Sequence, residues 1–283
     1  MLSLGFGLVA AMAWAVHDLL VRKLTQGSAI LPMLVVVLAA GSAALLVPAL
    51  FLGGWDEMGW PSVTWAVAAG VAYVMGVSGL YQSFSRAPVR VVAPVVGSFP
   101  MLSLGLAALQ GREVVLVEWL AVGAIVAGIS WVALTGRSEE GTTRGSLGAA
   151  LAWAIAGAAG FAFTFALGQE AVRLGAEMPA MIITRVTALI LILIMAVAAR
   201  SVQPAAGTGK TLVGMGVLDA IALGSVTASA TLPHPEYAAV SAALFGVLTI
   251  LLAWRVLNER VAPMQWLGIG GVFAGIAVLS LQA

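Results

Sequence analysis

The stretch that decides the fold is 87–134, which begins APVRVVAPVV and ends LQGREVVLVEWLAVGAIVAGISWVAL. The same pattern returns in outline at 235–281, as PEYAAVSAALFGVL at its start and LNERVAPMQWLGIGGVFAGIAVLSL at its end. Aligned 147 positions apart, Trp119 corresponds to Trp266. A repeat of this length in an apolar chain is typical of transporters built from two similar halves, whereas solenoid repeats are much shorter.

The composition indicates an integral membrane protein. Of 283 residues, 61% are hydrophobic and 9% are charged, whereas about 25% of the residues of a soluble domain are charged. Lys and Arg number 13 and Asp and Glu 12, so the net charge is +1. A balance this even gives no basic surface for nucleic acid. The absence of cysteine excludes disulfides and thiolate chemistry.

Ten segments are predicted to span the membrane, since a spanning helix needs about 20 mostly apolar residues. The polar linker GRSEEGTTR at 136–144 leaves five of them on each side. The predicted spans are 3–21, 29–52, 61–84, 88–109, 115–135, 146–168, 178–199, 211–231, 235–254 and 263–281.

The predicted fold class is therefore an all-α polytopic membrane protein with two five-helix repeats, 1–136 and 145–283, around a central cavity. Because each half has an odd number of spans, the second half enters the membrane from the opposite face, which makes the repeat inverted. Glycines inside spans, such as Gly157 and Gly160, are expected at close contacts between helices. We expect a monomer whose partners are the lipid bilayer and a small-molecule substrate.

Lys and Arg are concentrated in the loops of one face, which the positive-inside rule makes cytoplasmic. Both termini are then expected on the periplasmic or exterior side of a bacterial inner membrane. The basic residues assigned to the cytoplasmic face are Arg22, Lys23, Arg86, Arg90, Arg137, Arg144, Arg200, Lys210, Arg255 and Arg260.

Two motifs that suggest an enzyme fail on inspection. The sequence GTGKT at 207–211 resembles the end of a phosphate-binding loop, but Pro204 occupies the position of the first glycine and no strand–helix unit surrounds it. The two histidines, His17 and His234, are predicted on opposite faces, so they form neither a metal site nor a catalytic triad. We expect no catalytic residue, no cofactor and no bound metal.

Arg185 and Asp219 are ionisable residues inside predicted spans, where a charge is costly and faces protein or water. They have two interpretations. In the structural interpretation they pair with each other or Arg185 reaches the nearby interface. In the functional interpretation they act on the substrate: Asp219 titrates or holds an ammonium group, and Arg185 holds a carboxylate. At the corresponding positions the first half has Leu38 and Ala72, so this charge is not symmetric.

Further polar and aromatic residues inside the spans are candidates to contact a partly apolar substrate, with helix packing as the alternative for each. His17 lies beside Asp18, which is also spaced to pair with Arg22 one turn later. Pro94 and Pro100 interrupt the fourth span, which either frees carbonyls for a transport site or fixes a kink. The candidate substrate-binding residues are Trp14, His17, Tyr81, Gln82, Pro94, Ser98, Met101, Trp153, Phe161, Thr164, Arg185 and Asp219.

The echoed motifs resemble a known family. LNER at 257–260, QWLG at 265–268 and AGI at 274–276, with QGRE at 110–113 and AGI at 127–129 in the first half, resemble the closing signature of EamA-type carriers of the drug/metabolite transporter superfamily. The resemblance implies a ten-span inner-membrane carrier, often an exporter of amino acids or other small metabolites, with a cavity between its halves. It also implies a structural loop role for the glutamate of the LNER motif.

One departure from the superfamily limits what is carried over. Its small four-span multidrug members depend on a membrane-embedded glutamate in the first helix, whereas this region reads Ala10, Ala11, Trp14 here. Their proton-exchange mechanism is therefore not transferred to this chain.

The leading hypothesis is secondary transport by alternating access, with neutral and mainly aromatic amino acids exported. The competing transport hypothesis is a proton-coupled antiporter of drugs or nucleobase-type metabolites. From another class, a lipid-handling membrane protein would use the same apolar interior.

Overall fold

The computed structural model describes residues 2–99, 101–102, 105, 108, 113–135, 146–229, 241–242 and 244–282, and these residues are helical with short connections. The first half contains α1 (Leu2–Thr25), α2 (Ile30–Leu52), the 3-10 helix η1 (Trp55–Glu57), α3 (Trp60–Arg86), α4 (Val89–Val96) and α6 (Leu116–Thr135). The second half contains α7 (Leu147–Arg173), α8 (Glu177–Ala198), α9 (Gly209–Ser229), α11 (Phe245–Val256) and α12 (Pro263–Gln282).

The helices confirm the all-helical prediction, and six of those described are long and apolar enough to cross a membrane: α1, α2, α3, α7, α8 and α9. Prolines stand at or just inside several helix starts, as at Pro61 and Pro263, where the missing N–H removes no helical hydrogen bond. α1, α3 and α7 extend a few residues beyond the predicted spans because their last turns are polar ends that continue the helix past the apolar segment.

The fourth and ninth predicted spans differ from the described helices. α4 continues through Pro94 and ends at Val96, followed by a turn at Gly97 and Ser98, so the helix is not broken at Pro94 itself. A proline inside a helix removes one hydrogen bond but does not require the next turn to unwind. Pro100 lies outside the described residues, and of the ninth span the structure describes α11 and three residues before it, 241, 242 and 244.

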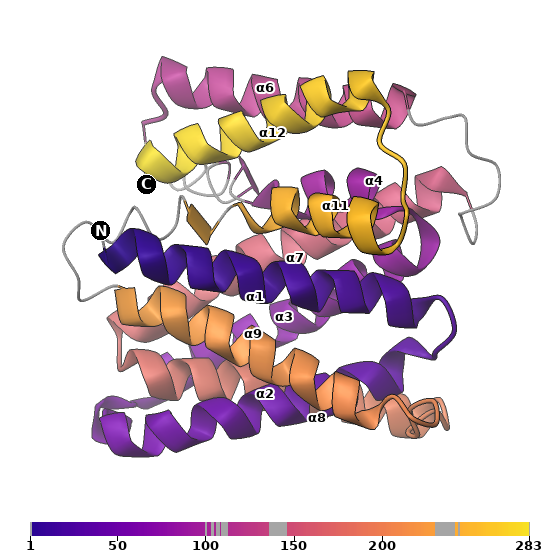
Figure 1. Ribbon diagram of the computed structural model, residues 1–283. Helices are drawn as coiled ribbons and strands as arrows, with labels where there is room; N and C mark the ends of the chain where they lie inside the picture. The colour runs from indigo at the N-terminus through magenta and orange to yellow at the C-terminus, as the bar shows by residue number, and fades with distance from the viewer. Residues whose placement is uncertain are drawn as a thin grey trace.

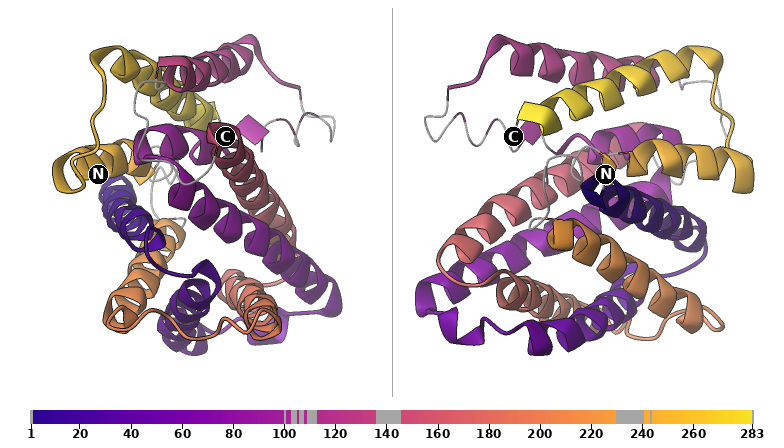
Figure 2. Two further views of the ribbon diagram at one scale, coloured as in Figure 1. Left: turned by 90° about the vertical axis from the view of Figure 1, so that its right-hand side faces the viewer. Right: turned by 60° about the vertical axis from the view of Figure 1, so that its left-hand side comes forward.

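The main helix contacts all join the first half of the chain to the second. α3 packs along α7, α1 and α2 pack on α9, α2 and α3 pack on α8, and α1 packs on α11. α6 and α12 form a separate pair at one side of the molecule, and the two ends of the chain lie at the same end of the bundle (Figure 1, Figure 2). The halves are therefore interleaved and do not form two independent domains.

Glycines allow the closest of these contacts, between α3 and α7. A methyl group on Gly79 would collide with the backbone of Gly157, and one on Gly160 would collide with the backbone of Gly76. The prediction that Gly157 and Gly160 mark a close helix contact is confirmed. Because the facing atoms are backbone, a neighbouring side chain cannot move aside to make room.

We expect Gly79→Ala to lower the free energy of unfolding by about 1–3 kcal/mol through overpacking. Gly123→Ala in α6 is the matched control, since a methyl group there would meet no atom within 4 Å. Thermal unfolding in detergent measures both variants. An equal response of the two variants would contradict the assigned α3–α7 contact.

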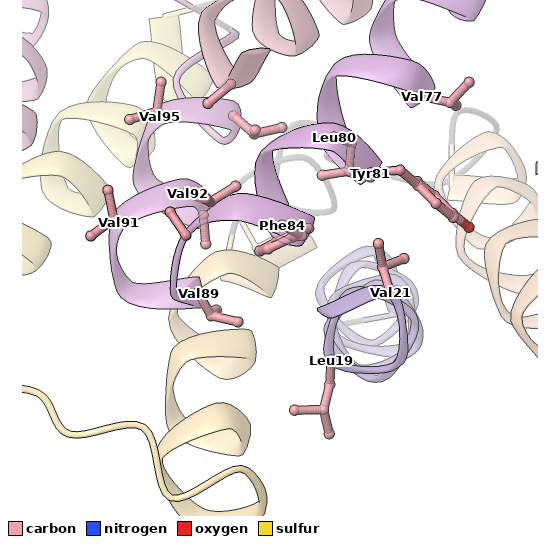
Figure 3. Close-up of a cluster of buried hydrophobic side chains, with 14 of the residues drawn as sticks. Leu19, Val21, Val77, Leu80, Tyr81, Phe84, Val89, Val91, Val92 and Val95 are labelled. Carbon is pink, nitrogen blue, oxygen red and sulfur yellow. The ribbon is translucent and has the colours of Figure 1, made fainter. Parts of the chain in front are cut away.

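A cluster of buried apolar side chains joins the ends of α1, α3 and α4 (Figure 3). Val21 of α1 faces Leu80 and Phe84 of α3, and the valines of α4 complete the cluster. Tyr81 lies at its edge with its hydroxyl group directed away from the cluster. This packing fixes the relative position of α1 and α3, the two helices that contribute most of the polar residues described next.

Candidate functional site

An ion pair lies inside the helical bundle between α8 and α9. The guanidinium Nη2 of Arg185 is 2.6 Å from Oδ2 of Asp219. The two side chains differ in accessibility, because Arg185 is 2% exposed whereas Asp219 is 14% exposed. The ion pair that the sequence suggested is therefore present, and the Asp219 carboxylate is its more accessible member.

Aromatic side chains from α1 and α3 complete this group. Trp14 donates from Nε1 to Oδ1 of Asp219 over 3.1 Å, and the Tyr73 hydroxyl donates to Oδ2 over 3.5 Å. The Arg185 guanidinium lies 5.8 Å from the centroid of the Tyr73 ring, within the range of a cation–π contact. We call Trp14, Tyr73, Arg185 and Asp219 the central cluster.

Two further rings border the central cluster. Phe161 of α7 is tilted against Tyr73, with ring centroids 6.1 Å apart. Phe245, the first residue of α11, meets Trp14 edge to face at 5.9 Å. Edge and tilted contacts of this kind are the favoured geometries of aromatic pairs. The central cluster thus contains one ion pair and rings from α1 and α3, and it is bordered by rings from α7 and α11.

Glycine makes room for the arginine. A methyl group on Gly41 of α2 would overlap the Arg185 guanidinium and approach the backbone oxygen of Gly216 in α9. α2 therefore supplies the space in which the guanidinium reaches Asp219. The Nε atom of Arg185 is buried and makes no hydrogen bond within the described part of the chain.

A second polar group lies one turn farther along α1. His17 Nδ1 is 3.0 Å from Oδ1 of Asp18, and His17 Nε2 is 3.4 Å from the Tyr81 hydroxyl. All three side chains are buried. The local pairing of Asp18 with Arg22 that their spacing suggested is not formed, because Arg22 is bound elsewhere.

Gln82 and Trp153 meet through a residue that was not among the candidates. Arg86 donates from Nη1 to the side-chain and backbone oxygens of Gln82, and its guanidinium lies 5.8 Å from the centroid of the Trp153 ring. This group lies at the last turn of α3, away from the central cluster.

The remaining candidates make local or packing contacts. The Ser98 hydroxyl donates to the Val95 carbonyl over 2.7 Å, and the Thr164 hydroxyl donates to the Gly160 carbonyl over 2.7 Å. Pro94 is buried, and Met101 packs against the large apolar core. None of these four side chains has a contact with the central cluster among the interactions of the described residues.

A third polar network joins the two halves at the end of the bundle opposite the termini. Arg22 donates from Nε to Oε1 of Glu259 over 2.8 Å and from Nη1 to the Phe84 carbonyl over 2.6 Å. Oε2 of Glu259 accepts the backbone N–H of Val89, the first residue of α4, over 2.7 Å. We call this the Arg22–Glu259 network. The loop role expected for Glu259 is thus a specific one: it binds α1 and caps α4.

The fold and its buried polar groups define a class of protein, a multi-pass membrane protein with charged side chains between its helices. Groups of three or more metal-ligating side chains are absent from the residues described. Residues 148–281 match the EamA-like transporter family. The match supports membership of the drug/metabolite transporter superfamily, whose EamA branch comprises membrane transporters of small metabolites and not enzymes. The matched region contains the LNER motif at 257–260 and the AGI motif at 274–276, which carry the resemblance in the second half.

Comparison of structures supports the fold. One solved chain, titled only as the crystal structure of a protein, is similar over 99% of this chain and 97% of its own length, with a TM-score of 0.64 at 18% identity. This similarity shows a shared fold and says nothing about the substrate. No curated protein sequence matches the chain.

Proposed function

We propose that the protein is a secondary transporter of the bacterial inner membrane that exports neutral amino acids, above all aromatic ones. The observation that carries the proposal is the central cluster, a charge-balanced ion pair bordered by aromatic rings. A resemblance of the sequence to the bacterial aromatic amino-acid exporter YddG supports the same substrate class.

The residues in and around the central cluster suit an aromatic amino acid that has no net charge. Asp219 is the accessible carboxylate, so it would accept the substrate ammonium group, while Arg185 holds it in position from behind. Trp14, Tyr73 and Phe161 offer ring surfaces that an aromatic side chain would contact. Because Arg185 and Asp219 balance each other, a substrate with no net charge enters without leaving a buried charge unpaired.

Alternating access would follow from the interleaved halves. In chain order, α1, α2, α3, α4 and α6 of the first half correspond to α7, α8, α9, α11 and α12 of the second half. Under this correspondence the α3–α7 contact is equivalent to the α1–α9 contact, and the α2–α8 and α6–α12 contacts are each equivalent to themselves. This pattern supports an inverted repeat. The α3–α7 contact is the more extensive of that pair, so the two ends of the bundle are packed unequally, as expected for one state of an alternating-access carrier. The protein would act as a monomer, since both halves of the site are in one chain.

Flux into proteoliposomes tests the proposal directly. Purified protein should carry labelled phenylalanine faster than empty vesicles do, with excess tryptophan competing and excess glutamate not competing. Vesicles that contain Asp219→Asn are the matched control, because the variant keeps the shape of the side chain and removes the charge. No flux above empty vesicles would reject an amino-acid substrate.

The same assay separates the alternatives. An organic cation that carries aromatic rings would also suit Asp219 and its surrounding rings, so a drug antiporter predicts transport of such a cation and no transport of phenylalanine. A lipid-handling protein predicts movement of fluorescent lipid between leaflets with neither solute transported.

We expect Gly41→Ala to reduce phenylalanine flux at least about tenfold, because displacing the Arg185 guanidinium by a fraction of an ångström costs more than about 1.4 kcal/mol in the substrate complex. Gly214→Ala in α9 is the control, since a methyl group there meets no atom within 4 Å. Initial flux rates of the two variants at equal protein density are the measurement. Unchanged flux in Gly41→Ala would show that the position of Arg185 does not matter.

A further inference from the structure

A second carboxylate, Asp18, lies beside the central cluster, and no Lys or Arg among the described residues is paired with it. Asp18 is 4% exposed, and within the described residues its one polar partner is the ring of His17, itself 5% exposed. Arg22, one turn along the same helix, is held by Glu259. Among the residues that the structure describes, His17 is therefore the group that can neutralise Asp18.

The His17–Asp18 pair is part of a row of three groups that links two helices. The row runs from the Asp18 carboxylate through the His17 ring to the Tyr81 hydroxyl of α3. His17 and Tyr81 also touch edge to face, with ring centroids 6.1 Å apart. Such a row of exchangeable groups can bind a proton at one point and pass it along.

The charges around this row decide how many protons it holds. A carboxylate buried between helices is stable when it is protonated or paired with a cation. Arg185 and Asp219 already neutralise each other. His17 and Asp18 are neutral as a pair only when they share one proton, and losing it leaves a net charge of −1 inside the bundle.

The helices packed against α1 supply no other cation to Asp18. Their titratable and charged residues are Tyr73, Tyr81 and Arg86 of α3, Asp219 and Lys210 of α9, and Arg255 of α11. Lys210 and Arg255 are exposed, and Arg86 binds Gln82. None of these cations has a contact with Asp18 in the part of the chain that the structure describes.

The row also lies within reach of the central cluster. Trp14 and Asp18 are four residues apart on α1 and so share one face of the helix, and Trp14 binds Asp219 directly. The face of α1 that carries Asp18 is therefore the one directed toward Asp219. The charge on the His17–Asp18 pair is therefore sensed at Asp219.

We propose that His17 and Asp18 form a proton-binding site whose occupancy sets how strongly Asp219 attracts a substrate ammonium group. The proposal rests on the proposed function. When the pair has lost its proton, its negative charge adds to that of Asp219 and favours ammonium binding. When a proton arrives from the exterior, the pair becomes neutral and the ammonium is released there. The proton later leaves to the cytoplasm, and the only bonds made and broken are those to the proton.

This scheme is an exchange of one proton for one substrate molecule. Binding of the two is mutually unfavourable, and the coupling is reciprocal by linkage. It assigns the ionisable role to His17 and Asp18 and leaves Asp219 permanently charged in its pair with Arg185.

A spectroscopic test needs no substrate. His234→Gln leaves His17 as the one histidine of the chain, so nitrogen-15 labelling of histidine reports on it alone. We expect its ring signals to change with pH, and Asp18→Asn to displace that change. Asp56→Asn, which removes an exposed carboxylate in η1, should leave it in place. A His17 signal that ignores pH, or that responds identically in Asp18→Asn, overturns the proposal.

A flux test shows the coupling. In proteoliposomes with an acidic lumen, one-for-one exchange lets a gradient of one pH unit concentrate phenylalanine inside up to about tenfold. We expect His17→Gln and Asp18→Asn to lose this accumulation and still to equilibrate phenylalanine across the membrane. Accumulation retained by both variants, or wild-type flux that ignores the gradient, overturns the proton site.

The two tests distinguish failure of the proposed function from failure of the proposed proton site. If the wild-type protein moves no phenylalanine but the His17 signal depends on Asp18, the proposed substrate is wrong and the proton site stands. If phenylalanine moves and the His17 signal is independent of Asp18, the proposed function stands and the proton site is wrong.

Discussion

Arg185→Gln is expected to abolish flux and to lower the free energy of unfolding by about 3–5 kcal/mol. The variant leaves the Asp219 carboxylate among Trp14 and Tyr73, with their hydrogen bonds but without the cation that lies 2.6 Å away. A largely buried charge that has lost its partner costs more than the pair contributed, because its desolvation is no longer offset by the cation. Thermal unfolding in detergent and proteoliposome flux are the measurements.

The double variant Arg185→Gln, Asp219→Asn separates charge from shape. It removes both charges and keeps two amides at the same positions, so it should recover most of the lost stability, since well-packed neutral replacements of a buried pair are often close to neutral in stability. Flux should stay absent, because no carboxylate is left for the substrate ammonium. If the double variant is as unstable as the single one, the ion pair is not what the stability depends on; if its flux returns, Asp219 does not bind the substrate.

The pairing of Arg185 with Asp219 is the part of the site that the sequence predicts best, and the reason is physical. A charge inside an apolar span needs a partner, and the spans offer very few. Tyr73 is a polar aromatic residue of the third predicted span, but nothing in the sequence places it on Asp219, 146 positions away. That contact depends on how α3 and α9 are rotated about their axes, which hydrophobic periodicity does not determine when a helix is apolar on all sides.

Local spacing was misleading at Asp18 and Arg22. The four-residue spacing favours a pair within one helix, yet Arg22 binds a glutamate 237 positions later and Asp18 binds its sequence neighbour. Exposed pairs within a helix are worth only a few tenths of a kcal/mol, so a buried acceptor that also caps another helix is the stronger partner. The loop motif that contains Glu259 indicated the family, but the network it forms becomes visible only once the two halves are packed together.

The long repeat indicates the helices but not the central cluster, because a repeat shows only the positions that the two halves share. Positions shared by the halves set helix contacts: Gly128 of α6 meets the backbone of Gly268, and its counterpart Gly275 of α12 meets the backbone of Ala121. The central cluster instead uses residues without a symmetric counterpart, since Arg185 and Asp219 correspond to Leu38 and Ala72. Leu38 is buried in the apolar core. A symmetric scaffold thus holds an asymmetric site.

Glu259→Gln is expected to open the end of the bundle at which Arg22 lies. In the Arg22–Glu259 network one carboxylate binds α1 through Arg22 and α4 through the backbone N–H of Val89, so a second-half residue fastens two first-half helices. Both side chains of the ion pair are buried, at 6% and 9% exposure. Removing the charge deprives the buried Arg22 guanidinium of the carboxylate that lies 2.8 Å from its Nε, which penalises this closed state by several kcal/mol. Since about 1.4 kcal/mol is a tenfold change in population, the equilibrium should move strongly toward a state in which this end is open.

Cysteine labelling measures that shift cleanly, because the chain has no cysteine of its own. Thr25→Cys places a thiol in the last turn of α1, where the side chain is 2% exposed, and Ser62→Cys places one at the start of α3 near the other end, where it is fully buried. Adding Glu259→Gln should raise the maleimide labelling rate of the Thr25→Cys protein at least about tenfold and leave that of the Ser62→Cys protein low. General loosening of the fold would expose both thiols, whereas alternating access exposes one end while the other stays closed. Equal labelling of the Thr25→Cys protein with and without Glu259→Gln would show that the Arg22–Glu259 network joins the halves but does not act as a gate.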